Sequence, residues 1–353
     1  MFQDLIDCGH EKIIYCSEPD AGLKAIIAIH NTVLGPAFGG CRVRKYERDE
    51  DALAEVLRLS RAMTYKTAAA NLGVGGGKSV IIADPATEKT PELLVAFAKC
   101  VDSLGGMYCT APDVGMTVPD LNLIYSHTKY VNGCDASPHG LGDPSIPTAR
   151  GAFLGVLAGA EIRLDRKDLE GVKIAVQGVG NVGIQLVEML VKSGAKVTVS
   201  DVAKERISIA AEKFGVQVAE PDAIYDADCD VFVPAGLGGT INKDTIPRLK
   251  AKLVVGPANN QLLDEKADAL LLAGRDIYFI PDFIVSCGGV TMGTCEFKQI
   301  PYDEAFKMID IVTPNVFEID GIAKKKNITT TEAAMEMAWN RVLAAKKPVK
   351  GGK

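Results

Sequence analysis

The sequence lacks the features that mark membrane, metal-binding or nucleic-acid-binding proteins. No apolar run is long enough to span a membrane, and the first 16 residues carry acids rather than the apolar core of a signal peptide. The four histidines are isolated and form no H-x-x-x-H pair, so we predict no metal site. Apart from the short tail 344–353, lysine and arginine form no block, and the net charge is −6. Nothing therefore points to nucleic acid or an anionic membrane as a partner.

The nine cysteines are odd in number, scattered along the chain, and without a C-x-x-C pair. This usage is typical of a reducing compartment, so we expect a cytoplasmic protein. A length of 353 residues suggests two domains. The hydrophobic content of 47% and charged content of 24% are ordinary for a soluble globular protein and suffice for two cores.

The first part of the chain is predicted to mix helices and strands. An amphipathic helix is expected over 48–72, with Asp49 or Asp51 as its cap, and a buried strand over 78–85. The Pro-, Gly-, Ser- and Asp-rich segment 135–148 is the best candidate for a domain boundary. Beyond it strands and helices alternate, which predicts a parallel, doubly wound sheet.

The predicted fold class is therefore α/β with two domains. We expect an N-terminal α/β substrate and oligomerisation domain over 1–140 and a Rossmann-type domain over 141–325. Two helices, 303–326 and 329–347, lie outside the alternating pattern. The segment 326–353 is expected to supply a helix that packs back on the first domain and then a disordered tail.

A G-x-G-x-x-G motif at 178–183 follows a predicted strand and opens a predicted helix. Gly178 would make the tight turn, Gly180 would admit a pyrophosphate to the backbone, and Gly183 would allow close helix–strand packing. The turn also contains Asn181 and Val182. Asp201 ends the next strand, where a carboxylate accepts hydrogen bonds from a ribose diol and repels a 2′-phosphate, which favours NAD over NADP. The alternatives are a turn without a ligand and an aspartate that caps a helix.

The glycine-rich stretch 73–79 resembles a P-loop, but its first glycine is missing because residue 72 is Leu. A P-loop also follows a strand and opens a helix, whereas this loop follows a helix and opens a strand. We therefore interpret the glycines as room for a substrate beside Lys78. Burial would favour the neutral amine of Lys78, and Lys66 lies twelve residues earlier. Two ordinary surface lysines are the alternative.

Several segments, in order along nearly the whole chain, resemble the leucine/phenylalanine/valine dehydrogenase branch of the amino-acid dehydrogenases, relatives of glutamate dehydrogenase. The segments that carry the resemblance are LGPAFGGCRV, LRLSRAMTYKTAAANLGVGGGKSVII, TAPDVGM, DPSIPTARGAFLGV, IAVQGVGNVG, CDVFVPAGLGGTIN, VVGPANNQL and PDFIVSCGGV. The resemblance implies a substrate domain first and an NAD domain second, with a cleft between them. It also implies reversible oxidative deamination, in which an L-amino acid, NAD and water give the 2-oxo acid, ammonium and NADH.

The same resemblance assigns roles to residues. Lys66 is expected to bind the substrate carboxylate, helped by backbone at Gly40 and Met63. Lys78 is expected to be the proton-transferring base and Asp113 to shuttle protons to and from the amino group. Thr148 and Asn260 match positions that touch cofactor or substrate, although Asn260 also suits a turn.

The residues implied for the side-chain pocket are apolar: Phe38, Ala111, Val290 and Gly293. They favour an apolar substrate but leave branched-chain and aromatic amino acids open. Ser286 departs from the asparagine usual in the family, and Cys41 stands where threonine is usual. An amine or atypical amino-acid dehydrogenase and a non-catalytic dinucleotide-binding regulator stay as alternatives. A homo-oligomer is expected by resemblance.

Overall fold

The computed structural model describes residues 8–346, and the predictions for the first residues and for the tail lie partly outside that range. The chain forms two compact units. Unit 1 consists of Met1–Gly142, Val290–Ala305 and Ala338–Lys353, and unit 2 of Asp143–Gly289 and Phe306–Met337. Both contain helices and strands, so the predicted α/β fold class is confirmed.

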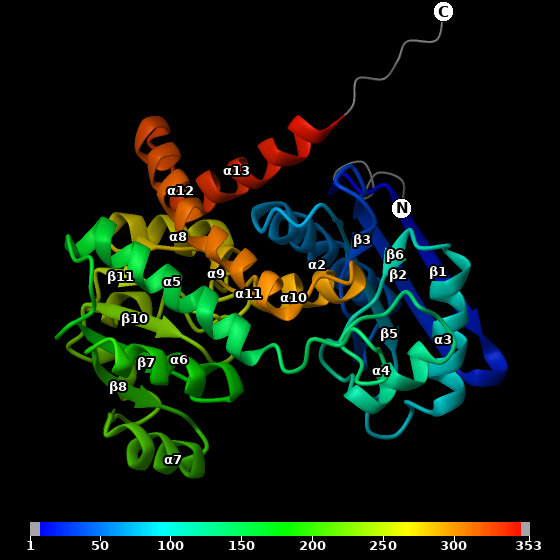
Figure 1. The fold of residues 1–353 in the computed structure, drawn as a ribbon, viewed down its shortest axis with the longest axis horizontal. Coiled ribbons are helices and arrows are strands. Elements are labelled where there is room, and N and C mark those ends of the chain that lie inside the picture. Colours follow the sequence, from blue (N-terminus) through cyan, green and yellow to red (C-terminus); the bar gives the residue numbers. More distant parts are fainter. Residues whose placement is uncertain (1–7, 347–353) are drawn as a thin grey trace, which may run out of the picture. The chain divides into compact units, whose positions relative to one another are not determined.

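Within the described part of unit 1, six strands form one mixed sheet in the order β1–β2–β5–β3–β6, with β4 also paired to β5 (Figure 1). Strand β2 is antiparallel to β1 and β5, whereas β3 and β4 run parallel to β5. The elements are β1 (Lys12–Glu18), β2 (Leu23–Asn31), β3 (Ala37–Phe38), β4 (Cys41–Arg44), α2 (Asp49–Ala69), β5 (Gly75–Ile82), α3 (Pro91–Ser103), β6 (Tyr108–Cys109) and α4 (Val118–Tyr125). Strand β5 therefore lies inside the sheet, and its residues are almost all buried.

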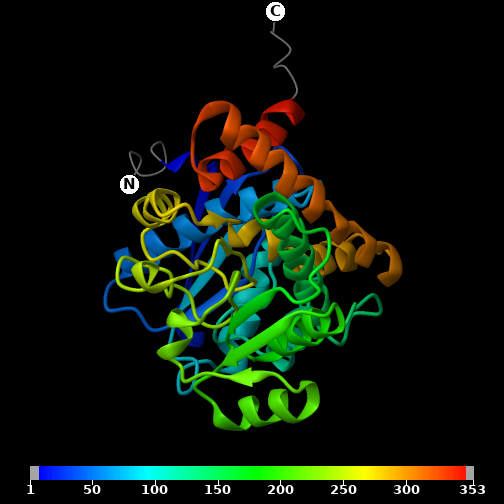
Figure 2. The ribbon, with the colours of Figure 1, turned by 90° about the vertical axis from the view of Figure 1, so that its left-hand side faces the viewer.

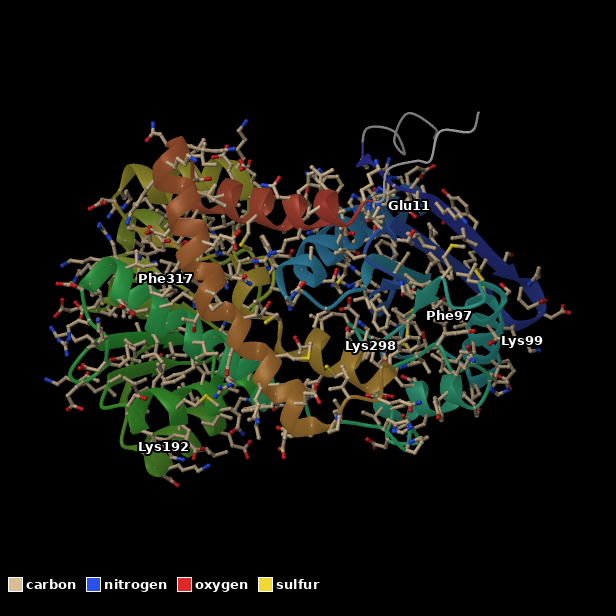
Figure 3. The ribbon with its side chains drawn as sticks, turned by 45° about the horizontal axis from the view of Figure 1, so that its top comes forward. Glu11, Phe97, Lys99, Lys192, Lys298 and Phe317 are labelled. Atoms are coloured by element: carbon tan, nitrogen blue, oxygen red, sulfur yellow. A yellow bond between two sulfur atoms is a disulfide. The ribbon has the colours of Figure 1, made fainter. Side chains whose placement is uncertain are left out.

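Two long helices pack on this sheet. Helix α2 buries Val56 and Leu57 in a cluster with Ile26 and Val80 of the sheet, while α3 buries Phe97 in the larger core (Figure 3). The expected cap of α2 is wrong, because Arg48 occupies that position without a side-chain cap bond and the acids fill the first turn instead. There the acids interact favourably with the positive end of the helix.

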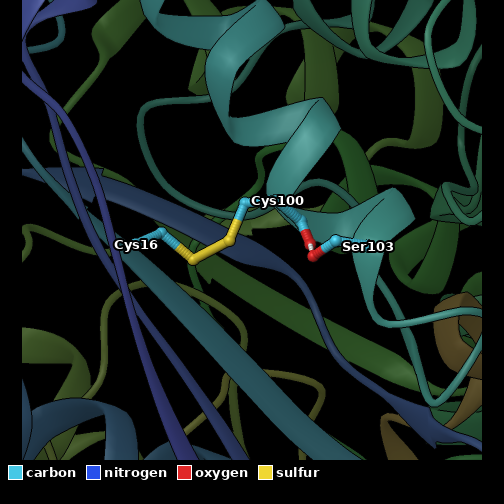
Figure 4. Close-up of a disulfide and its surroundings, with 3 residues drawn as sticks. All are labelled: Cys16, Cys100 and Ser103. Carbon is cyan, nitrogen blue, oxygen red and sulfur yellow. Dashed lines mark hydrogen bonds between the residues drawn. A yellow bond between two sulfur atoms is a disulfide. The ribbon is translucent and has the colours of Figure 1, made fainter.

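A disulfide joins Cys16 of β1 to Cys100 of α3, across a sequence separation of 84 (Figure 4). Ser103 lies beside it and donates a hydrogen bond of 2.6 Å to the Cys100 carbonyl. Disulfides persist mainly in oxidising compartments. The cysteine pattern predicts a reducing compartment, in which this disulfide would not be expected.

Unit 2 contains a parallel sheet in the order β12–β11–β10–β7–β8–β9. Helices α5 and α6 run beside its strands and α7 beside β8 (Figures 1 and 2). The elements are α5 (Ser145–Leu164), β7 (Lys173–Gln177), α6 (Asn181–Lys192), β8 (Lys196–Ser200), α7 (Lys204–Phe214), β9 (Gln217–Val218), β10 (Val231–Pro234), β11 (Leu253–Val254), α8 (Glu265–Gly274), β12 (Tyr278–Phe279) and α9 (Asp282–Val285). This is the doubly wound order of Rossmann folds, in which the first strand lies centrally and the order of the later strands reverses to its other side.

The last helices are α10 (Gly288–Phe297), α11 (Tyr302–Met308), α12 (Val312–Lys326) and α13 (Thr330–Ala345). A single helix over 303–326 is not observed, because a 3-10 turn at Ile309–Ile311 separates α11 from α12. Helices α10, α11 and α13 contribute residues to both units. Over residues 8–346, no helix combines the length and apolar character that a membrane crossing requires.

Candidate functional site

Lys78 is held inside unit 1 by its place in the middle of β5. Its backbone pairs with Ala28 of β2, and only 7% of the residue is exposed. The ammonium forms an ion pair with the Asp113 carboxylate, whose side chain is 14% exposed. The structure thus brings the two expected proton-transfer residues into direct contact.

Asp113 reaches Lys78 because the loop after β6 packs on the start of β4. The Cys41 amide donates to the Ala111 carbonyl at 2.8 Å, and the Ser79 amide donates to the Gly40 carbonyl at 3.3 Å. A Cβ on Gly40 would lie 2.5 Å from the Pro112 carbonyl oxygen, so glycine is required for this approach. The expected substrate-binding positions Gly40 and Ala111 therefore border the ion pair.

The charge on Asp113 is set by competing effects. Burial raises the pKa of this carboxyl, but Lys78 and Arg42 outweigh burial and leave the pKa below its ordinary value. The carboxyl is therefore an anion at neutral pH, able to accept a proton.

Glycines 75 to 77 of β5 make room for protein rather than for a substrate. A Cβ on Gly75 would lie 2.0 Å from the Asn31 carbonyl oxygen, and one on Gly76 would lie 2.2 Å from the Thr64 amide nitrogen. A Cβ on Gly77 would meet the Tyr108 ring at 3.0 Å. The interpretation of these glycines as space beside Lys78 is wrong, because strand β2, helix α2 and Tyr108 fill that space.

This close approach positions the part of α2 that carries Met63 and Lys66. The Met63 side chain lies 3.3 Å from where a Cβ of Gly39 would be, so it borders the Gly39–Gly40 turn. Lys66 is in the last turn of α2 and is half-buried. The close packing of Thr64 on Gly76 fixes this end of the helix against β5.

Two polar groups near the Lys78–Asp113 ion pair, the Tyr108 hydroxyl and the Arg42 guanidinium, were not predicted. The Tyr108 hydroxyl, fully buried, donates to the Gly39 carbonyl at 2.5 Å and lies 3.0 Å from the Ser79 hydroxyl. Arg42 of β4 contacts Asp113 at 3.3 Å. Neither Cys41–Arg44 nor Tyr108–Cys109 was predicted as a strand, so no sequence signal marked these two groups.

Three of the four expected apolar pocket residues lie on β3 and α10, and the fourth, Ala111, lies in the loop after β6. Phe38 of β3 is 3% exposed, and its ring meets that of Phe297 edge-on at a centroid distance of 5.2 Å. Phe297 ends α10, the helix that also carries Val290 and Gly293. A Cβ on Gly293 would lie at an ordinary contact distance of 3.6 Å from the Asn132 Cβ, so this position has room for a small side chain.

The motif at 178–183 has the geometry of a dinucleotide-binding turn. Gly178 has a φ of 100°, in the left-handed region, and a Cβ on Gly183 would lie 2.2 Å from the Gly178 carbonyl oxygen. Around a Cβ on Gly180, by contrast, the nearest atom of the described chain is Arg206 Nη1 at 3.5 Å. Helix α6 begins directly after this turn, at Asn181 and Val182. The open face at Gly180 and the helix N-terminus fit the pyrophosphate of a dinucleotide.

Asp201 is tied to the same turn. One carboxylate oxygen accepts from the Val179 amide at 2.8 Å, and the other accepts from the Ala203 amide at 2.9 Å. The residue does not cap α7, whose N-cap is Ala203. Each oxygen keeps a further lone pair, so the carboxylate can still accept from a ribose hydroxyl.

Thr148, Asn260 and Ser286 all lie in unit 2. The Thr148 hydroxyl lies 3.6 Å from where a Cβ of Gly289 would be. Asn260 adopts a φ of 52°, and its backbone N–H donates to the Asp282 carboxylate at 2.7 Å. Ser286, which departs from the family pattern, donates to Asn259 at 3.5 Å. The chain segment that carries Asn260 is therefore linked to α9 and to the residue that follows it.

In the part of the chain that the structure covers, no three His, Cys, Asp or Glu side chains gather as a metal site would require. The positive charge beside the Asp113 carboxylate is the ammonium of Lys78. A lysine amine and a carboxylate in contact are groups that can transfer protons.

Known proteins match both halves of the chain. Residues 10–130 match the dimerisation domain of Glu/Leu/Phe/Val dehydrogenases, and residues 202–349 match Glutamate/Leucine/Phenylalanine/Valine dehydrogenase. Leucine dehydrogenase of Geobacillus stearothermophilus is 42% identical over 98% of this chain and 94% of its own. Phenylalanine dehydrogenase of Caldalkalibacillus thermarum is 43% identical over 94% and 91%.

Solved structures agree. The crystal structure of L-tryptophan dehydrogenase from Nostoc punctiforme superimposes with a TM-score of 0.89 at 40% identity, covering 98% of this chain and 99% of that one. The fold, the paired lysine and aspartate, and the glycine turn are thus accompanied by full-length similarity to three kinds of amino-acid dehydrogenase. The chain belongs to the Glu/Leu/Phe/Val dehydrogenase family of amino-acid oxidoreductases, which use a nicotinamide dinucleotide.

Proposed function

We propose that the protein catalyses the NAD-dependent, reversible oxidative deamination of an apolar L-amino acid to the 2-oxo acid, ammonium and NADH. The buried Lys78–Asp113 ion pair is the observation that carries this proposal. Deamination consumes water and removes protons from the substrate, so it needs a positioned base and a positioned carboxylate. Unit 1 is proposed as the substrate domain and unit 2 as the NAD domain.

In unit 1, Lys66 binds the substrate carboxylate, with the backbone at Gly40 and the Met63 region completing that contact. Asp113 accepts a proton from the substrate ammonium. Once its own ammonium proton has left to solvent, Lys78 acts as the base: its neutral amine takes a proton from the water that attacks the imino acid. Phe38, Ala111 and Val290 bound the side-chain pocket, and their apolar character supports an apolar substrate.

In unit 2, the turn 178–183 holds the pyrophosphate, and Arg206 near Gly180 adds a positive charge beside it. Asp201 accepts from the adenosine ribose, which supports NAD over NADP because a 2′-phosphate would face a carboxylate. Thr148 and Asn260 are proposed to orient the nicotinamide and the substrate. When bound, the nicotinamide supplies the acceptor for the hydride that leaves the substrate Cα.

The test is an absorbance screen for reduced dinucleotide at alkaline pH, with NAD or NADP and each of the twenty common amino acids. We expect NAD to be reduced with branched-chain or aromatic amino acids. No reduction with any amino acid would overturn the proposal. Reduction with simple amines would favour the alternative of an amine dehydrogenase.

Lys78→Met adds a sharper comparison, because the chain provides a matched control. Lys89 forms an ion pair with Asp120 at 2.5 Å, and its side chain is 11% exposed against 9% for Lys78. Lys78→Met should lower kcat by about 100-fold or more, as expected on loss of an acid–base group. Lys89→Met should leave kcat near that of the natural chain. Equal effects of the two substitutions would show that Lys78 is only structural.

A homo-oligomer in the cytoplasm completes the proposal. The match of residues 10–130 to a dimerisation domain supports assembly through unit 1. Sedimentation or light scattering measures the assembly state, and a monomer at assay concentration would contradict it. Fractionation of the source cells tests the location.

A further inference from the structure

Arg42 links the ion pair to a second buried carboxylate. It lies on β4, whose Cys41 pairs with Ser79, the neighbour of Lys78 on β5. One guanidinium nitrogen donates to Asp113 Oδ1 at 3.3 Å, and another donates to Glu55 Oε1 at 2.8 Å. The side chains of Arg42 and Glu55 are 16% and 14% exposed, so water screens these contacts weakly.

The two oxygens of Asp113 are thereby divided between partners. Oδ1 accepts from the Val114 amide at 2.6 Å and from Arg42. Oδ2 faces the ammonium of Lys78. A carboxylate held in this way cannot rotate about its last bond without breaking two hydrogen bonds at Oδ1.

We propose that Arg42 is a positioning residue for the proton-transfer pair: it holds Oδ1 of Asp113 so that Oδ2 faces Lys78, and Glu55 holds Arg42 in place. The proposal rests on the proposed function and extends it to a residue that does not touch the substrate. Oδ2 is then the atom that exchanges protons with the substrate nitrogen.

Glu55 suits the role of an anchor because it is itself fixed. The Tyr46 hydroxyl donates to its second oxygen. Arg44 and Arg58 approach Oε1 only at 3.6 and 3.9 Å, and because their side chains are more than half exposed they add little. The chain of charges from Lys78 through Asp113 and Arg42 to Glu55 alternates in sign. Such alternation lets each buried charge keep an opposite neighbour.

The arrangement also affects the pKa of Asp113. The groups that face Asp113 are Lys78 on β5 and, on β4, Arg42 and the Cys41 thiol, whose pKa burial raises to about 12. The thiol therefore stays neutral. Loss of the Arg42 charge removes one of the two cations that lower the pKa of Asp113, so the carboxyl should protonate at higher pH.

Arg42→Met is the principal test, with Arg44→Met as its control on the same strand, since the Arg44 side chain is 60% exposed. Arg42→Met should lower kcat for deamination by roughly 10- to 100-fold, as small misplacements of catalytic groups do. KM for the amino acid should change little. The acidic limb of the pH profile of kcat/KM should move to higher pH. Arg42→Lys should restore part of the rate, and Glu55→Gln should move the limb in the same direction by less.

A second readout does not depend on turnover. Carboxyl-carbon NMR of aspartate-labelled protein, with Asp113→Asn to assign the signal, gives the titration of Asp113 directly. Its midpoint should rise in Arg42→Met and stay unchanged in Arg44→Met. If both the midpoint and the pH profile of Arg42→Met match the natural chain, the inference is wrong even though the enzyme turns over. If Arg42→Met fails to fold, Glu55→Gln decides by the same two measurements. Absence of turnover in the natural chain refutes the proposed function alone, because the NMR midpoint still tests Arg42.

Discussion

Opening the Cys16–Cys100 disulfide should lower the free energy of unfolding of unit 1 by about 4.6 kcal/mol. The estimate follows from the sequence separation of 84, because a crosslink removes loop-closure entropy from the unfolded chain. At 25 °C the entropy change for a loop of this length is about −15 cal/mol/K in that treatment. For a unit of this size the loss corresponds to a fall in Tm of roughly 9–18 °C.

The assay is thermal or guanidinium unfolding with and without reductant. The double variant Cys16→Ala/Cys100→Ala serves as the control, because its stability should not respond to reductant. On protein purified without reductant, alkylation followed by mass spectrometry should find Cys16 and Cys100 unalkylated, because they are joined in the disulfide. If both thiols are free, the disulfide does not form in this chain. If the disulfide forms but its reduction changes the unfolding free energy by less than about 1 kcal/mol, the entropy argument fails.

Two further predictions concern the packing around β5. Gly76→Ala should destabilise unit 1 by about 2 kcal/mol or more in denaturant unfolding, because its Cβ would lie 2.2 Å from the Thr64 amide nitrogen. Gly321→Ala in α12 is the control, since outside its own helix no described atom lies within 4 Å of its Cβ. It should be neutral or stabilising by up to about 1 kcal/mol. Equal losses of unfolding free energy in the two variants would contradict the packing argument. Burial lowers the pKa of His30 to about 4 from 6.5, so the folded state stays neutral while the unfolded chain takes up a proton below pH 6.5. The resulting contribution of His30 to the free energy of unfolding, about 3 kcal/mol, is fully present above pH 6.5 and is lost as the pH falls towards 4. His30→Gln should therefore flatten the plot of unfolding free energy against pH in this range. An unchanged slope would exclude His30 as its source.

Local sequence was sufficient to predict the glycine turn at 178–183 and the sheet around it. Gly178 takes a positive φ within the turn, and Gly183 packs on the nearby Gly178 carbonyl. The strand-to-helix context is visible in the hydrophobic pattern. The alternation of strands and helices likewise predicted the parallel sheet of unit 2, since parallel strands require crossover connections.

Other features depend on residues far apart in the chain. The use of Gly76 could not be predicted because its partner Thr64 belongs to another element. Arg42 meets Asp113 across 71 positions, and no local pattern announces that contact. Helix α10 was missed because Gly288 and Gly289 suggest a turn, whereas a Cβ on Gly288 would lie 2.3 Å from the Pro147 carbonyl, so close helix packing requires glycine there. Strand β1 was missed because its largely exposed residues give no clear alternation.

The packing of Trp339 provides a spectroscopic consequence. It is the single tryptophan of the chain, so its emission reports from one place. Its ring lies 6.1 Å from that of Tyr65, the neighbour of Lys66, and 6.3 Å from that of His30. A protonated imidazole quenches indole fluorescence on contact. The protein therefore carries an intrinsic optical probe, which can follow both the acid titration of His30 and any movement of the helix end that bears Lys66, without an added label.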